Sequence, residues 1–195
     1  MLRAYYDIAQ KEKFEKRFSN LWIGSRPTQL QGTFQILFLD FSRVGGLDGT
    51  LAQNFDDYCC GGLDDFASIY EPYYYPGFEG EMKAQCGTTN KLNFLDRKAR
   101  NNGSRLYLIV DEYDNFTNMV LNEQDDKVYH ALTYASGFYR EIFKKFKGMF
   151  ERIFMTGVSP ITLDDLTSGF NIGWNISTDH QFNMMLGFSE TDVRE

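Results

Sequence analysis

Two adjacent carboxylates, Asp111 and Glu112, directly follow an apolar run over residues 106–110. In phosphoryl transfer, an aspartate at such a position holds Mg²⁺, usually through water. The carboxylate that follows can act as a general base and accept a proton from an attacking water molecule. Adjacent positions suit both roles, because the strand ends there and the two side chains diverge. The alternative is a strand that ends in a solvated acidic turn without catalytic function.

Three buried strands must position these carboxylates. Residues 34–41, 105–111 and 152–156 form nearly continuous apolar runs. Such runs are typical of strands that are covered on both faces of a parallel sheet. Helical patterns lie between them, and this alternation indicates an α/β fold with right-handed crossovers and helices on both faces of the sheet.

Polar side chains stand at the carboxyl ends of all three predicted strands, which is where ligands of parallel sheets bind. Asp40 ends the first strand, Asp111 and Glu112 end the second, and Thr156 ends the third. Two readings of Thr156 stay open: its hydroxyl contacts a ligand, or it caps the next turn. For Asp40 we expect a role in a turn at the border of the site.

Helical periodicity of apolar side chains predicts the connecting elements. The clearest helix spans 128–149, and Gly103 closes a shorter one whose apolar face covers 92–99. The other predictions are short helices over 2–10 and 14–18, a polar and broken helix over 50–70, a turn-rich aromatic stretch over 71–80, a short helix from Ser159 and a capping box at 189–192.

Composition excludes several function classes. The net charge of −7 is unfavourable for nucleic-acid binding, which needs clustered Lys and Arg side chains. Three cysteines without metal-like spacing indicate reduced thiols in a cytoplasmic protein. No apolar run is long enough to cross a membrane.

Longer stretches around these residues resemble the bacterial AAA-ATPase-like family. The similarity lies in residues 108–116, 152–160, 163–172 and 185–188, and it weakens over 45–100. The resemblance implies an α/β P-loop NTPase-like three-layer sandwich that uses ATP and Mg²⁺. It also implies that Asp111 is the Walker B magnesium residue, that Glu112 is the catalytic glutamate and that Thr156 is a polar sensor near the γ-phosphate. Members of the family often carry a PD-(D/E)XK nuclease-like domain further downstream.

The sequence departs from that family in one respect. The phosphate-binding loop G-x-x-x-x-G-K-[ST] occurs nowhere in it. We therefore expect residues 1–195 to be a partial domain truncated at the N-terminal P-loop strand, with residues 1–7 as the remainder of the helix after that loop. Alone, such a chain is expected to be inactive as an ATPase and to self-associate through unpaired strand edges.

Alternative functions rest on other residues. A non-catalytic interaction or regulatory remnant is the main alternative to an ATPase core. A nuclease interpretation uses Glu81 and Lys83 in an E-x-K pattern with Asp64 and Asp65 upstream, although these residues flank a segment without strand periodicity. A binding-module interpretation uses exposed aromatics for stacking, against the simpler expectation that they pack on the sheet; they are Tyr70, Tyr73, Tyr74, Tyr75 and Phe78.

Overall fold

A parallel sheet of three strands forms the centre of the protein. The computed structural model describes residues 1–45, 51–115, 138–158, 174–177 and 179–182. Strands β1 (Gln35–Asp40), β2 (Leu106–Asp111) and β3 (Arg152–Met155) lie side by side in the order β1-β2-β3. Both pairings are parallel. The three predicted strands and their parallel arrangement are therefore confirmed, as is the α/β class.

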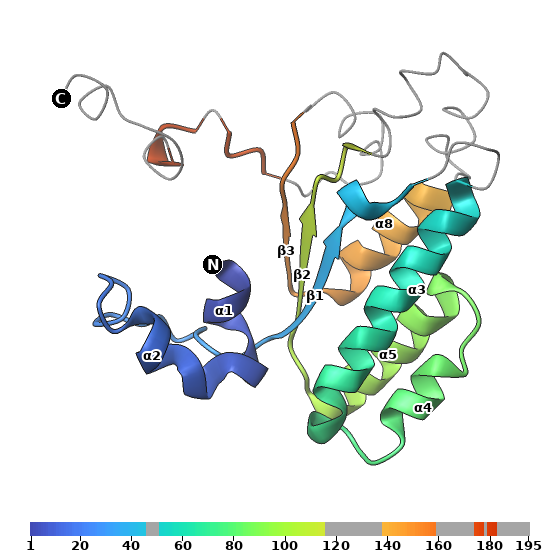
Figure 1. The fold of residues 1–195 in the computed structure, drawn as a ribbon, viewed down its shortest axis with the longest axis horizontal. Coiled ribbons are helices and arrows are strands. Elements are labelled where there is room, and N and C mark those ends of the chain that lie inside the picture. Colours follow the sequence, from blue (N-terminus) through green and yellow to red (C-terminus); the bar gives the residue numbers. More distant parts are fainter. Residues whose placement is uncertain (46–50, 116–137, 159–173, 178, 183–195) are drawn as a thin grey trace.

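Long helices cover one face of this sheet. Figure 1 shows α3, α5 and α8 on the same side of the three strands. Leu37 and Leu39 of β1 and Leu108 and Val110 of β2 point into the buried cluster that these helices share. Apolar positions of the strands thus supply one half of the core. The helices are α3 (Leu51–Tyr70), α4 (Phe78–Lys83), α5 (Thr88–Asn102) and α8 (Phe138–Met149), with short 3₁₀ turns at Phe41–Arg43 and Glu71–Tyr73.

The opposite face carries the N-terminal segment. Phe34, Ile36, Tyr107 and Ile109 form a second buried cluster, against which Leu2 of α1 (Leu2–Tyr6) packs. The short helix α1 therefore lies on this face, whereas the described crossover helices α3, α5 and α8 share the other one, so the predicted placement of crossover helices on both faces is not seen among the described residues. The expected helix over 2–10 is shorter, because the 3₁₀ helix Ile8–Lys13 follows Asp7 and leads into α2 (Phe14–Phe18).

Helix α3 is continuous, so the prediction of a broken helix over 50–70 is wrong. Two consecutive glycines stand in its middle, and each weakens an isolated helix by roughly 1 kcal/mol. Tertiary packing compensates, because Phe55, Leu63 and Phe66 of α3 are buried in the shared core. Gly62 also permits close contact with the sheet: a Cβ atom there would lie 2.8 Å from Leu39 Cδ2.

The aromatic stretch after α3 packs inward. Tyr70 and Phe78 are buried, and the ring of Tyr74 stacks on Phe78 with centroids 4.0 Å apart. The Tyr74 hydroxyl donates a hydrogen bond of 2.6 Å to Gln35 Oε1. The expectation that these aromatics pack inward is confirmed for Tyr70 and Phe78, whereas Tyr73 is exposed.

Several sequence predictions fall outside the described residues. They are the first part of the helix over 128–149, the helix that begins at Ser159 and the capping box at 189–192. Helix α8 is the described part of the predicted helix over 128–149. Gly103 follows α5 with φ 67°, as expected of a helix C-cap.

Burial of Tyr74 predicts a loss of stability at high pH. Burial raises the pKa of Tyr74 to about 12, whereas an unfolded tyrosine titrates near pH 10. Below about pH 10 the Tyr74 hydroxyl keeps its proton in both the folded and the unfolded chain, so the free energy of unfolding is not reduced. As the pH rises from about 10 to 12, the unfolded chain releases the proton first, so unfolding becomes more favourable.

We expect Tyr74→Phe to reduce this loss of melting temperature, because phenylalanine has no proton to release. The measurement is thermal unfolding by circular dichroism over that pH range. Tyr73→Phe, at a side chain that is 36% exposed, is the matched control. It should leave the decrease of melting temperature with pH unchanged. The prediction would be contradicted if the melting temperature of Tyr74→Phe fell with pH as steeply as that of the wild type.

Candidate functional site

The structure brings Asp111 and Thr156 into direct contact. Asp111 is the last residue of β2, and Thr156 follows the last residue of β3. The Thr156 hydroxyl donates a hydrogen bond to Asp111 Oδ1, and the Thr156 amide donates one of 2.9 Å to the carbonyl of Val110. Parallel pairing of β2 and β3 sets this contact, which joins two residues 45 positions apart.

Glu112 follows Asp111 in a backbone conformation that L residues rarely adopt. Its φ is 54°, which costs of order 1–3 kcal/mol when a non-glycine residue is held there. Neighbouring bonds hold it: its amide donates to Asp111 Oδ1 at 3.2 Å, and its carbonyl accepts from Asn115 N at 3.0 Å. Strain of this kind often accompanies a functional position. No local sequence pattern predicts this conformation.

Asp114 braces the loop that follows β3. Its side chain is fully buried, and both carboxylate oxygens accept from the amide of Val158, at 3.1 and 3.0 Å. A second link joins the same loops, because Tyr113 N donates to Thr156 O at 3.0 Å. These bonds fix the position of Thr156 relative to Asp111.

Tyr139 supports the loop from the helical layer. This residue of α8 is fully buried, and its hydroxyl donates a 2.6 Å hydrogen bond to the carbonyl of Tyr113. Burial raises the pKa of Tyr139 well above its ordinary value. The hydroxyl therefore stays protonated and acts as a hydrogen-bond donor. Periodicity marks Tyr139 as a core residue, but its hydroxyl contact depends on the tertiary fold.

Asp40 lies at the same edge of the sheet but is engaged locally. It is the register partner of Asp111. Its carboxylate accepts from Ser42 N at 3.1 Å and from Ser42 Oγ at 2.6 Å, and it pairs with Arg43 Nε at 3.2 Å. The expected turn role of Asp40 is thus confirmed.

The donor set at the strand ends consists of oxygen atoms. Asp111 is exposed, whereas Glu112 and Thr156 are half-buried. Carboxylate and hydroxyl oxygens are the hard ligands that Mg²⁺ prefers, usually with several waters retained. Within the described ranges, no group of three or more His, Cys, Asp or Glu side chains is arranged to hold a metal ion by protein ligands alone. The residues present therefore fit a water-rich magnesium site and not a closed metal cage.

The residues of the nuclease interpretation do not converge on a metal. Asp64 lies on α3 and pairs with the buried Lys91 at 2.6 Å. Lys83 of α4 pairs with Glu79, also at 2.6 Å. Glu81 accepts from Tyr75 Oη at 2.7 Å. Asp64, Lys83 and Glu81 thus lie on helices and are engaged in ion pairs or hydrogen bonds there, which argues against a nuclease core in this segment.

The cysteines have no disulfide. Cys59 is buried, Cys60 is half-buried and Cys86 is exposed, and all three are free thiols. Burial raises the pKa of Cys59 well above its ordinary value. A buried thiol of that kind is inert, so Cys59 contributes packing and not nucleophilic chemistry.

Comparison with known proteins identifies the class of protein. The family model described as "Predicted AAA-ATPase" matches residues 1–167. The chain therefore belongs to the AAA-ATPase-like family. Neither the curated proteins nor the solved structures gave a significant match. The described helices are all too short or too polar to span a bilayer.

Gly157 is predicted to be essential for the loop that follows β3. A Cβ atom there would lie 2.5 Å from Asp114 Oδ1 and 2.5 Å from Tyr113 Cε1. We expect Gly157→Ala to lower the free energy of unfolding by about 1–3 kcal/mol, the usual cost of overpacking. Gly148→Ala on α8 is the control, since a Cβ there meets no atom within 4 Å.

The free energy of unfolding of both variants is measured by urea denaturation. The control should be neutral or up to about 1 kcal/mol more stable, because alanine favours a helix. Equal stability of the two variants would show that the contact between Gly157 and Asp114 does not constrain the loop.

Proposed function

We propose that this chain is part of an ATP-binding and ATP-hydrolysing core that transfers a phosphoryl group to water with Mg²⁺. The observation that carries the proposal is the contact between Asp111 and Thr156 at the carboxyl ends of adjacent parallel strands. Membership of a family described as predicted AAA-ATPases supports the same function. Ligands of parallel sheets bind at this edge.

Each residue has a separate role in the proposed reaction. Asp111 is the residue that would hold Mg²⁺, and the ion, when bound, would neutralise charge on the phosphate oxygens. The Glu112 carboxylate accepts a proton from water as the water oxygen bonds to the γ-phosphorus and the bond to the ADP oxygen breaks. Thr156 orients the Asp111 carboxylate through its hydroxyl, and we propose that it also senses the γ-phosphate.

An interaction or regulatory domain is the second candidate function. The observation that favours it is the absence of a G-x-x-x-x-G-K-[ST] segment from residues 1–195. Backbone amides and the lysine of that loop supply most of the affinity for nucleotide phosphates. In this reading the chain binds a partner, and self-association or a downstream nuclease-like domain would provide that partner.

Residues 1–195 alone should bind ATP weakly. Without the loop, the proposed site lacks the backbone amides and the lysine that bind nucleotide phosphates. Isothermal titration calorimetry with ATP and Mg²⁺ should therefore show no binding at micromolar concentrations. Micromolar, Mg²⁺-dependent binding would show that another segment of this chain supplies the phosphate site.

Catalytic roles can be separated in a chain extended upstream by a phosphate-binding loop. Asp111→Ala should weaken Mg²⁺-nucleotide binding, because a metal-binding carboxylate is lost. Glu112→Gln should bind normally but hydrolyse ATP about 10²-fold more slowly or worse, because an amide cannot accept the proton. Thr156→Val should lower hydrolysis by a smaller factor. The measurements are nucleotide affinity and single-turnover hydrolysis, corrected for the folded fraction.

Two outcomes would change the proposal. If Glu112→Gln hydrolysed ATP at the wild-type rate, the Glu112 carboxylate could not be the general base. A Thr156→Val protein that melts at a lower temperature but keeps its turnover per folded molecule would assign Thr156 to the turn alone.

A further inference from the structure

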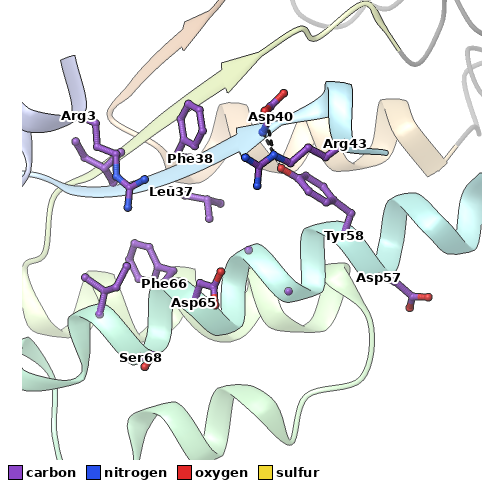
Figure 2. Close-up of a pocket in the computed structure, with 14 residues that line it drawn as sticks. Arg3, Leu37, Phe38, Asp40, Arg43, Asp57, Tyr58, Asp65, Phe66 and Ser68 are labelled. Carbon is purple, nitrogen blue, oxygen red and sulfur yellow. Dashed lines mark hydrogen bonds and ion pairs between the residues drawn. The ribbon is translucent and has the colours of Figure 1, made fainter. Parts of the chain in front are cut away.

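A groove runs between the outer edge of β1 and helix α3 (Figure 2). Its volume is about 560 Å³, which is within the range of small-molecule and peptide sites. The groove lies on the side of β1 that faces away from β2. None of the residues assigned to ATP hydrolysis lines it, so an inference about it does not depend on the proposed function.

Backbone groups of β1 point alternately towards β2 and towards this groove. Gln35 N donates to Arg105 O at 2.9 Å, so odd-numbered residues of β1 pair with β2. Even-numbered residues therefore present their amide and carbonyl groups at the outer edge. An open edge of this kind can pair with another extended chain.

Two tyrosines of α3 cap this edge on either side of one residue. Ile36 N donates to Tyr70 Oη at 2.9 Å, and Asp40 N donates to Tyr58 Oη at 2.8 Å. Between them lies Phe38, whose backbone amide and carbonyl have no hydrogen-bond partner among the described residues. The outer edge of β1 thus has one open pairing position, and it faces the groove.

Gly61 keeps the groove open at this position. It stands next to Gly62 in the middle of α3, but the two glycines differ. A Cβ at Gly62 would crowd Leu39, whereas a Cβ at Gly61 would meet no atom within 4 Å. Core packing therefore does not require glycine at 61, although glycine there weakens the helix. Because Gly61 has no side chain, the groove stays accessible at this position.

Charged groups of both signs surround the open position. The Arg3 guanidinium lies 5.8 Å from the centre of the Phe38 ring, and Arg43 reaches in from the end of β1 (Figure 2). Both arginines contact side chains of even-numbered β1 residues, on the face of the sheet that α1 covers. Asp65 comes from α3, on the opposite face. The face towards α1 therefore carries the Arg3 guanidinium beside the Arg43–Asp40 ion pair, and the face towards α3 carries Asp65.

We propose that this groove binds a short extended peptide whose central residue pairs with Phe38 and is acidic, with basic residues on either side. Side chains of paired residues lie on the same face of a sheet, and their neighbours lie on the other. The central carboxylate would then lie near Arg3, and a flanking cation would lie near Asp65, over the space left by Gly61.

The same edge already pairs with an extended segment at Phe34, four residues before Phe38. Asp7 forms a parallel bridge with Phe34, through Phe34 N to Tyr6 O at 3.0 Å and Ile8 N to Phe34 O at 2.8 Å. The peptide would repeat that pairing at Phe38. The four residue steps from Ile36 to Asp40 span about 13 Å, and the tyrosine hydroxyls at both ends limit the ligand to roughly three residues.

Three capped tripeptides test the proposal on residues 1–195. The first is acetyl-Lys-Glu-Lys-amide, the second is the charge-reversed acetyl-Glu-Lys-Glu-amide, and the third is the first peptide with N-methyl groups on its second and third residues. Binding is followed by the shift of the Phe38 amide in ¹H–¹⁵N correlation spectra. We expect a saturable shift with the first peptide, about tenfold weaker binding after charge reversal, and at least about fivefold weaker binding after N-methylation.

Protein variants test whether the groove is the binding site. Gly61→Leu places a side chain in the open space and should weaken binding at least about tenfold, the effect of overpacking on a ligand. Gly80→Leu on the exposed side of α4 is the matched control, since a Cβ there also meets no atom within 4 Å. Circular dichroism melts confirm that both variants are folded.

The possible results divide clearly. Loss of binding in Gly61→Leu but not in Gly80→Leu, together with the expected order of the peptides, supports the proposal. It is overturned if no peptide gives a saturable shift, if charge reversal leaves the affinity unchanged, if the N-methylated peptide binds equally well, or if Gly61→Leu binds as the wild type does.

Discussion

Parallel pairing of the three strands is the constraint on which the rest of the structure depends. Strands that run in the same direction need long crossovers, here built from α3, α4 and α5 between β1 and β2. Those helices bury the face formed by Leu37, Leu39 and Leu108. The same pairing places every strand end at one edge of the sheet, so contacts between Asp111 and Thr156 follow from the register and not from proximity in sequence.

Helix α3 stabilises the sheet in two ways. Its apolar side chains fill the core, and its tyrosines cap the outer edge of β1 at Ile36 and Asp40. Capping by a hydroxyl satisfies a backbone donor that would otherwise be available for pairing with another chain. Tyr70 also donates to the buried carboxylate of Asp7 at 2.9 Å, which ties the N-terminal segment to the same edge. Both functions require an unbroken helix, and its two glycines are tolerated because tertiary packing outweighs local propensity.

Sequence reasoning predicted the elements better than the contacts between them. The strands and the α5 helix were predictable because long apolar runs and a glycine cap are local signals. The continuity of α3 was not, because it depends on the burial of Phe55, Leu63 and Phe66 in a core that distant segments share. The strained backbone of Glu112 and the two bonds from Val158 N to Asp114 also depend on tertiary structure. At the candidate site, residue types were predictable, but the interactions that hold them were not.

The three strand ends look alike in sequence but differ in what their polar groups can do. At the end of β1, the Asp40 carboxylate is occupied by Ser42 and Arg43. At the end of β2, Asp111 is exposed and bonded across strands to a hydroxyl. A carboxylate neutralised by an arginine is less able to attract a cation than one that accepts only neutral donors. Of these two carboxylates, Asp111 is therefore the better candidate for the proposed metal site, and the bonds of Asp114 and Thr156 hold the loops around it.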